Sequence, residues 1–247
     1  MRKICTSQAA FATMLLILSA LVYSLHYILF RDSHHLFMFL VGDIAFVFIE
    51  VLLVSMILHR LLEMREKREK LKKLNMVIGS FFGETGTDLL RHLALFDAEI
   101  EKNRSLLQIG ADWQSKEFTN LKRQIEKGFG SLHAGNNDLV LLHEFLATHR
   151  QHLLRIVENP NILEHDRFSD MLWAVFHLED ELGHRRNLCQ LSEVDLSHLS
   201  GDLQRAYQLL VVEWLAYLQH LQTDYPYLFS LARRLNPFDP QASAEVD

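Results

Sequence analysis

The chain has 247 residues, of which 49% are hydrophobic, and it carries a formal net charge of −6 at pH 7, so it can hold one or two domains. Its two cysteines, Cys5 and Cys189, are too few for a disulfide framework and have no metal-binding spacing. Only four prolines and ten glycines occur, which argues against long irregular stretches.

Two long apolar runs follow each other near the N-terminus. Residues 9–30 contain no formal charge, and residues 36–58 are interrupted only by Asp43 and Glu50. A helix needs ~20 residues to cross the ~30 Å hydrocarbon core of a bilayer, so each run is long enough. A cleaved signal peptide is the alternative for the first run. That run is long for a signal peptide, however, and a second apolar run follows it instead of a small-residue cleavage site. We therefore predict a transmembrane hairpin.

Basic residues set the predicted orientation of this hairpin. Arg2, Lys3 and seven further basic residues flank the two outer ends of the hairpin, whereas only Arg31 lies in the connector at residues 31–35. An excess of Lys and Arg marks the cytoplasmic side of a membrane helix, so both termini are expected in the cytoplasm, at a bacterial cytoplasmic (inner) membrane. The residues expected to contact lipid headgroups are Arg60, Arg65, Lys67, Arg68, Lys70, Lys72 and Lys73.

Five polar residues fall inside the predicted spans. Ser19, Tyr23 and His26 share one face of the first helix, and Asp43 and Glu50 share one face of the second. Folding the hairpin brings Tyr23 and His26 to the depth of Asp43, so the two polar stripes are expected to meet. Interhelical hydrogen bonding is the favoured role of these residues. A proton or ion path between several copies of the hairpin is the alternative.

No Gly or Pro follows the second run before Gly79, which predicts that its helix continues through Asn75. The spacing of apolar residues after Leu58 also forms a weak coiled-coil pattern, and dimerisation through it is left open. The segment at residues 75–87 reads Asn-Met-Val-Ile-Gly-Ser-Phe-Phe-Gly-Glu-Thr-Gly-Thr. It places Gly79 and Gly83 on one helix face, which favours either the close approach of another helix or a hinge. The segment resembles one in uncharacterised prokaryotic two-span membrane proteins of similar layout. That resemblance implies no activity and no site.

The chain therefore divides into four predicted segments. Residues 1–35 form the first transmembrane helix and a short external connector, and residues 36–74 form the second, which continues into a basic juxtamembrane helix. Residues 75–240 form an acidic, all-helical cytoplasmic domain, because their periodicity is helical and no convincing stretch alternates as a strand does. Residues 241–247 form a flexible tail, and fraying is expected from Pro237 onward.

Charge separates the cytoplasmic domain from the rest of the chain. Residues 1–74 hold 10 basic and 6 acidic side chains, so the remaining residues carry a net charge of −10. An acidic domain binds phosphate poorly, so we expect no nucleic acid partner. The apolar helix at residues 202–222 is expected at the centre of the bundle. Asp97, Asp138 and Ser200 are expected to cap the helices that begin near residues 97, 138 and 202. The predicted helices of the domain cover residues 97–109, 112–127, 138–158, 167–188, 202–222 and 225–235.

Histidines are the most unusual feature of the domain, since the whole chain has 14 of them. His177, Glu181 and His184 follow a helical spacing and contain one E-x-x-H motif of the kind found in di-iron bundles. No second E-x-x-H motif occurs, and a helical projection places the three residues opposite the apolar stripe. We therefore predict that they are solvated and that no metal or other cofactor is bound. His149, by contrast, projects onto an apolar face and is expected to be a hydrogen-bonded core residue.

No P-loop, nucleophile elbow, zinc-protease motif or dinucleotide fingerprint occurs, so we expect no enzymatic activity. The sequence favours a membrane-anchored helical module for interaction, sensing or scaffolding, with a protein partner or a second copy of itself. The first alternative is a small oligomeric channel or ion-coupled component that uses Asp43, Glu50 and His26. The second alternative is a metal-binding, ferritin-like bundle.

Overall fold

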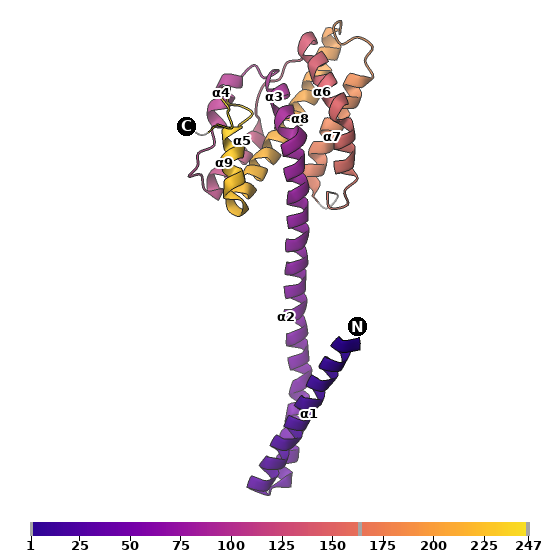
Figure 1. Cartoon of the computed structure of the whole chain (residues 1–247), viewed down its shortest axis with the longest axis vertical. Coiled ribbons are helices and arrows are strands. Elements are labelled where there is room, and N and C mark those ends of the chain that lie inside the picture. Colours follow the sequence, from indigo (N-terminus) through magenta and orange to yellow (C-terminus); the bar gives the residue numbers. More distant parts are fainter. Residues whose placement is uncertain (1, 163–164, 246–247) are drawn as a thin grey trace. The chain divides into compact units, whose positions relative to one another are not determined.

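A computed structural model describes residues 2–162 and 165–245 of the chain (Figure 1). The chain divides into two compact units, residues 1–67 and 68–247. Regular structure in the described ranges is helical, and the only β-type pairing there is an isolated bridge between Asp97 and Leu132. The predicted all-α fold is therefore confirmed.

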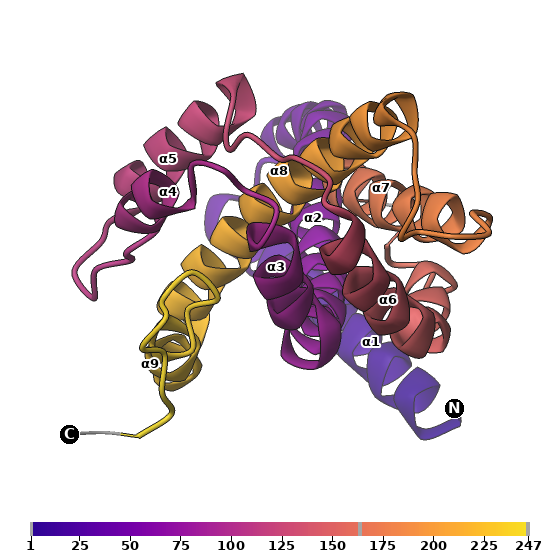
Figure 2. The same cartoon turned by 90° about the horizontal axis from the view of Figure 1, so that it is seen from above.

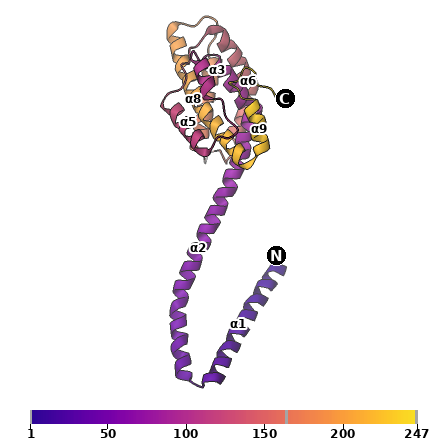
Figure 3. The same ribbon diagram turned by 90° about the vertical axis from the view of Figure 1, so that its left-hand side faces the viewer.

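The first unit contains helix α1, Arg2–Phe30, and the first part of helix α2, Ser33–Phe81. A two-residue turn joins them, with Arg31 at a φ of 49°, in the left-handed region (Figure 3). The Asp32 side chain accepts a hydrogen bond from the backbone N–H of His35 at 3.1 Å, which caps the start of α2. Because of this cap, α2 begins inside the connector predicted at residues 31–35.

The second helix extends beyond the predicted end at Asn75. Leu74, Ile78 and Phe81 are buried in the core of the second unit, which favours a continuous helix through this segment. A π-helical turn, η1 (Phe82–Gly86), and helix α3 (Thr87–Ala94) follow directly. A β-carbon at Gly86 would lie only 2.5 Å from the Phe81 ring, so glycine is needed for this packing.

The predicted pairing of Gly79 with Gly83 is only half right. A β-carbon on Gly79 would lie 3.7 Å from the Tyr217 ring, so Gly79 does lie close to another helix. Gly83 is exposed and has open space beside it. The close helix contact in this segment therefore involves one glycine.

The predicted helices of the second unit are all present, with shifted ends. The helix predicted to start at Asp112 instead starts at Ser115, because Gln114 and Glu117 form a capping box there. Asp97 does not cap a helix directly, since the next helix starts at Ile100. The remaining helices are α4 (Ile100–Leu106), α5 (Ser115–Lys127), α6 (Asn136–Val157), α7 (Asp166–Gly183), α8 (Glu193–Asp224) and α9 (Pro226–Arg234).

The largest difference from the predicted boundaries is at the start of α8. Ser192 is its cap, and the Ser192 hydroxyl accepts a hydrogen bond from the backbone N–H of Asp195 at 3.2 Å. The predicted cap, Ser200, lies inside the helix instead. Its hydroxyl donates to the Leu196 carbonyl at 2.7 Å and accepts from the Ala134 N–H at 2.9 Å. The residues before Asp202 are therefore helical rather than a connector.

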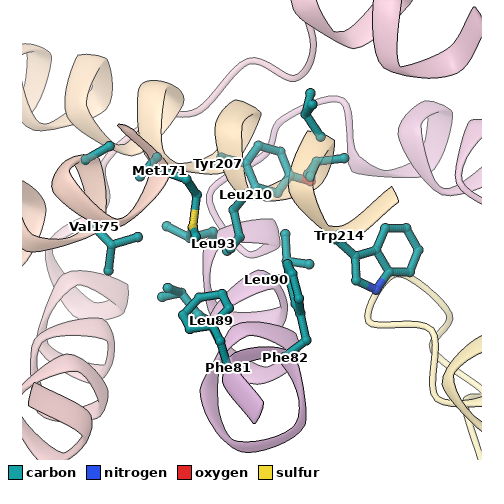
Figure 4. Close-up of a cluster of buried hydrophobic side chains, with 14 of the residues drawn as sticks. Phe81, Phe82, Leu89, Leu90, Leu93, Met171, Val175, Tyr207, Leu210 and Trp214 are labelled. Atoms are coloured by element: carbon teal, nitrogen blue, oxygen red, sulfur yellow. The ribbon is translucent and has the colours of Figure 1, made fainter. Parts of the chain in front are cut away.

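Helix α8 lies at the centre of the second unit, as predicted, and packs against α3, α5, α7 and α9 (Figure 2). It buries Tyr207, Leu210 and Trp214 in the core. Figure 4 shows that these side chains lie beside others from α2, η1, α3 and α7. The labelled neighbours are Phe81, Phe82, Leu89, Leu90, Leu93, Met171 and Val175.

The chain after α9 packs onto this core for a few residues. Phe238 is buried, with its ring 5.4 Å from that of Trp214. Asn236 donates a hydrogen bond to the carbonyl of Leu107 at 2.8 Å. The prediction that the chain frays from Pro237 onward is therefore wrong for Pro237 and Phe238, which are both buried. A flexible tail from residue 241 stays a prediction.

Candidate functional site

The two N-terminal helices are long and apolar enough, by length and composition, to cross a membrane. Their apolar windows lie within Ala10–Phe30 and near the start of the stretch Ser33–Ala94, and neither window is buried. Nearly all large apolar side chains between Phe11 and Leu58 are exposed. Soluble monomers rarely expose an apolar patch larger than a few hundred Å², so this surface needs an apolar environment or a partner.

One pair of the predicted intramembrane polar residues is in contact. The Tyr23 hydroxyl donates a hydrogen bond to Asp43 Oδ2 at 3.2 Å. His26 is half-buried and its ring packs against Phe30, with 4.8 Å between ring centroids. Ser19 and Glu50 are exposed. The predicted meeting of the two polar stripes is therefore confirmed for Tyr23 and Asp43.

The basic residues after the apolar part of α2 are all exposed, as headgroup contacts would require. Acidic residues alternate with them, among them Glu63, whose carboxylate lies 3.1 Å from His59 Nε2. Their contact with lipid stays a prediction. The seven exposed residues are Arg60, Arg65, Lys67, Arg68, Lys70, Lys72 and Lys73.

His177 and Glu181, two of the three predicted candidate metal ligands, lie beside two residues of α8. We call the resulting group the α7–α8 cluster: His177, Glu181, His198 and Asp202. His177 Nε2 lies 3.5 Å from Asp202 Oδ1 and 4.0 Å from Glu181 Oε1. His198 Nε2 lies 3.4 Å from Asp202 Oδ2 and 3.5 Å from Glu181 Oε2. Each helix contributes one histidine and one carboxylate, four residues apart on one face.

Burial and charge differ within the α7–α8 cluster. The Asp202 side chain is 5% exposed, whereas those of His177 and His198 are 47% and 53% exposed. Arg205 Nη1 lies 3.2 Å from Asp202 Oδ1. The hydrogen bond from Arg185 holds the pKa of Glu181 below its usual range, and the Arg185 Nη1 atom lies 2.7 Å from Glu181 Oε2. Among the described residues, His177, His198 and Asp202 form a group whose possible ligand atoms lie within 4.8 Å of one another, and Glu181 lies beside them.

The predicted trio of His177, Glu181 and His184 is not one group. His184 is exposed, and its Nδ1 atom lies 2.7 Å from the carbonyl oxygen of Asp180, at the end of its own helix. His177 and His184 are exposed, as predicted, whereas Glu181 is only partly exposed and the early turns of α8 lie beside it and His177. The sequence reasoning missed His198 and Asp202. The spacing of four residues between them was the available signal. It was overlooked because the helix was predicted to begin at residue 202, which left His198 outside it.

Two other titratable groups behave differently from the α7–α8 cluster. Burial raises the pKa of Glu213, on α8, to about 7, although the positive charges of Arg167 and Lys122 act in the opposite direction. His149 is half-buried, and its Nδ1 atom lies 2.8 Å from the Phe145 carbonyl oxygen. His149 is therefore hydrogen-bonded, as predicted, but it is not one of the buried core residues.

Together these features define an all-helical protein in which two apolar N-terminal helices precede a separate helical domain. The chain belongs to the MJ1433 family. The family models described as "MJ1433, N-terminal helical domain" and "Uncharacterized protein MJ1433, C-terminal helical domain" match residues 2–62 and 70–234. The boundary between the compact units, after residue 67, lies in the short stretch between the two matches.

A relative of high similarity is Uncharacterized protein MJ1433 of Methanocaldococcus jannaschii. It is 42% identical over 228 residues, which are 92% of this chain and 92% of that protein. No solved structure matches the chain. The comparisons therefore describe a family with two helical domains.

Proposed function

We propose that this protein is anchored in the cytoplasmic membrane by α1 and α2 and presents its helical domain as an interaction module on the cytoplasmic side. One observation carries the proposal: two consecutive helices expose nearly all of their large apolar side chains. A bilayer removes that surface from water, and a helix satisfies its own backbone hydrogen bonds there. A hairpin of two spans is the simplest arrangement that uses both helices.

Charge supports the orientation in this proposal. Nine basic residues lie at the outer ends of the two apolar runs, and Arg31 alone lies between them. Positively charged residues stay on the cytoplasmic side of membrane helices. The basic residues that follow the second run would then face anionic headgroups, whereas the acidic domain after them would be repelled from the same surface.

Two exposed aromatic side chains support an interaction role for the domain. Trp173 on α7 is 61% exposed and Tyr227 on α9 is 71% exposed. Trp and Tyr are enriched in protein interfaces, where they contribute large contact areas. The sequence carries no catalytic fingerprint, so we propose that the domain acts by binding a protein partner or a second copy of the chain.

Membrane extraction tests the anchoring. The full chain should remain in the membrane pellet after alkaline carbonate and high salt and should be released only by detergent. A matched fragment without residues 1–67 should be found in the soluble fraction. Release of the full chain by carbonate would contradict the proposal.

A second experiment tests the interaction role separately. The full chain is crosslinked in native membranes and purified through a C-terminal tag, and its captured proteins are compared with those of a Trp173→Ala, Tyr227→Ala double variant. The proposal expects a stoichiometric partner or a second copy of the chain, lost or reduced in the variant. Recovery of the uncrosslinked single chain alone would contradict it.

An ion path through several copies of the hairpin is the alternative use of Asp43, Glu50 and His26. Two helices cannot enclose a pore, so that function would require an oligomer. The hydrogen bond from Tyr23 to Asp43 engages the carboxyl group within one hairpin, which favours a role in helix packing. We therefore place helix packing first and the ion path second.

A further inference from the structure

We propose that the α7–α8 cluster binds one divalent first-row transition-metal ion, with imidazole nitrogens from His177 and His198 and carboxylate oxygens from Glu181 and Asp202. This inference goes beyond the anchoring and interaction proposed above and does not depend on them. It concerns the second compact unit only.

The distances in the cluster fit a common ion. Two donor atoms that each lie ~2.1 Å from a tetrahedral zinc ion are about 3.4 Å apart. Asp202 lies 3.5 Å from His177 Nε2 through Oδ1 and 3.4 Å from His198 Nε2 through Oδ2, and Glu181 Oε2 lies 3.5 Å from His198 Nε2. The donor atoms of His177, His198 and Asp202 all lie within 4.8 Å of one another. Side-chain rotation would have to bring one Asp202 oxygen and Glu181 to the same ion as the two histidines.

The donor set determines the class of metal. Two imidazoles with two carboxylates suit Zn²⁺ and its first-row neighbours, whereas Mg²⁺ and Ca²⁺ prefer ligands that are all oxygen. None of the four ligands is a thiol, which disfavours soft ions such as Cu⁺. The spacing of one histidine and one carboxylate per helix also places both donors of a helix on the same face.

Asp202 provides a second and independent indication of a ligand. Its side chain is 95% buried, yet its Oδ2 atom has no hydrogen-bond partner among the described residues. His198 Nε2 lies 3.4 Å from this oxygen without making a hydrogen bond to it. A buried carboxylate oxygen without a hydrogen bond is unfavourable, and a bound cation would satisfy it. The His177 and His198 side chains are half exposed, so an ion can reach the buried carboxylate from solvent.

Two arginines also contact the cluster and set its charge. Arg205 Nη1 lies 3.2 Å from Asp202 Oδ1, whereas the other carboxylate oxygen, Oδ2, lies near His198. Arg185 contacts Glu181 Oε2 at 2.7 Å, the oxygen that also lies 3.5 Å from His198, while Oε1 lies 4.0 Å from His177. Both arginines are therefore close neighbours of the carboxylates that would hold the ion. Their positive charge also opposes a cation, so we expect a dissociation constant in the micromolar range rather than the nanomolar range.

Equilibrium dialysis of the untagged full chain in detergent, after treatment with a chelator, tests the site. We expect one Zn²⁺ per chain and no displacement by millimolar Mg²⁺. The His177→Gln, His198→Gln double variant should lose at least 100-fold in affinity. The matched control is the His133→Gln, His184→Gln double variant, which removes two exposed histidines outside the cluster and should bind as the unsubstituted chain does.

The visible absorption of bound Co²⁺ tests whether the ion is coordinated by the proposed ligands. Co²⁺ in a four-coordinate site absorbs visible light more strongly than hydrated Co²⁺, and this band should disappear in the double variant. Zn²⁺ at about 100 times its dissociation constant should raise Tm by roughly 5–10 °C, because binding stabilises the folded state. The His133, His184 control should show the same shift as the unsubstituted chain.

Two outcomes would overturn the inference: a chain that binds no Zn²⁺ at stoichiometric level, or binding that the His177, His198 variant retains. Circular dichroism checks that this variant is folded. If it is not, the single His198→Gln variant decides the matter, since that side chain is 53% exposed and its loss should not disturb the core. Unchanged Zn²⁺ affinity in a folded His198→Gln chain would equally reject the site.

Discussion

The Tyr23 hydroxyl donates a hydrogen bond to Asp43 Oδ2 at 3.2 Å, which joins α1 to α2 through a carboxyl group in the apolar part of the chain. A neutral acid or an amide can accept this bond, whereas a leucine cannot. We predict that Asp43→Asn keeps the hairpin intact and that Asp43→Leu weakens helix packing by roughly 1 kcal/mol. Reversible unfolding in mixed detergent micelles measures the difference.

The Glu50→Gln and Glu50→Leu variants are the matched controls, because Glu50 is exposed and shares the predicted face of Asp43. Neither should change the stability of the hairpin by a comparable amount. If Asp43→Asn together with Glu50→Gln abolished ion flux into liposomes without changing oligomer size, the packing role would be rejected. The ion-path alternative would then take first place.

The orientation of the hairpin gives a second prediction. With Cys5 and Cys189 replaced by serine, a cysteine introduced at Ser33 should react with a membrane-impermeant thiol reagent added outside intact cells. A cysteine introduced at Ala244 should react only after the cells are opened. The reason is the nine-to-one bias of basic residues toward the outer ends of the two runs. The reverse labelling pattern would show that the orientation is wrong.

A third prediction concerns the second unit. A fragment of residues 68–247 should be soluble and predominantly helical, because it contains the whole buried core and the acidic surface. A shorter fragment of residues 82–247 lacks Leu74, Ile78 and Phe81, which are all buried. It should be much less stable or aggregate. Far-UV circular dichroism and thermal unfolding distinguish the two fragments, and equal stability would contradict the prediction.

Helical periodicity alone was enough to predict the fold class and the central position of α8. It worked because the apolar residues of that helix cover most of its circumference, so its burial does not depend on where it begins. The Tyr23–Asp43 contact was predictable for a similar reason. A short turn between two long helices fixes which residues lie at equal depth.

Helix boundaries were less predictable, because they depend on caps that compete over short distances. Ser192 and Ser200 both precede acidic residues, and the choice of Ser200 as the cap hid the first turns of α8. That one choice also concealed the α7–α8 cluster, because His198 was assigned to a connector. The boundary error therefore became an error about the candidate site.

Contacts between polar residues in the core of the second unit were not predictable. Asp97 was predicted as a helix cap, yet it is buried and accepts hydrogen bonds from groups far apart in the sequence. Its Oδ1 atom accepts from the Ser131 N–H at 3.0 Å, and its Oδ2 atom accepts from the Asn103 amide at 2.7 Å and the Tyr207 hydroxyl at 3.4 Å. Local sequence contains no signal for partners brought together only by folding.

Glu213 gives a final prediction, on pH dependence. Burial raises its pKa to about 7 in the folded protein, from about 4.5 for an exposed glutamate. The folded state therefore binds this proton more tightly than the unfolded state does. The resulting stability is fully present below pH ~4.5 and is lost as the pH rises through about 7, with a total on the order of 3 kcal/mol. Glutamine mimics the neutral acid, so Glu213→Gln should remove this loss. At pH 8 the variant should be more stable by roughly 1–3 kcal/mol, whereas at pH 5 the two proteins should differ little.

Chemical denaturation of the 68–247 fragment between pH 5 and 8 provides the measurement. The control is Glu144→Gln, at an exposed position on α6, which should keep the pH dependence of the unsubstituted fragment. Comparing the two variants cancels the titration of groups that do not interact with Glu213. Lys122 does interact with it, and the pKa of Lys122 is lowered mainly by burial. If Glu213→Gln and Glu144→Gln showed the same change in stability between pH 5 and pH 8, burial of Glu213 would not be the source of the pH dependence. A difference confined to the range above pH 5 would instead identify the buried carboxyl group as the titrating residue.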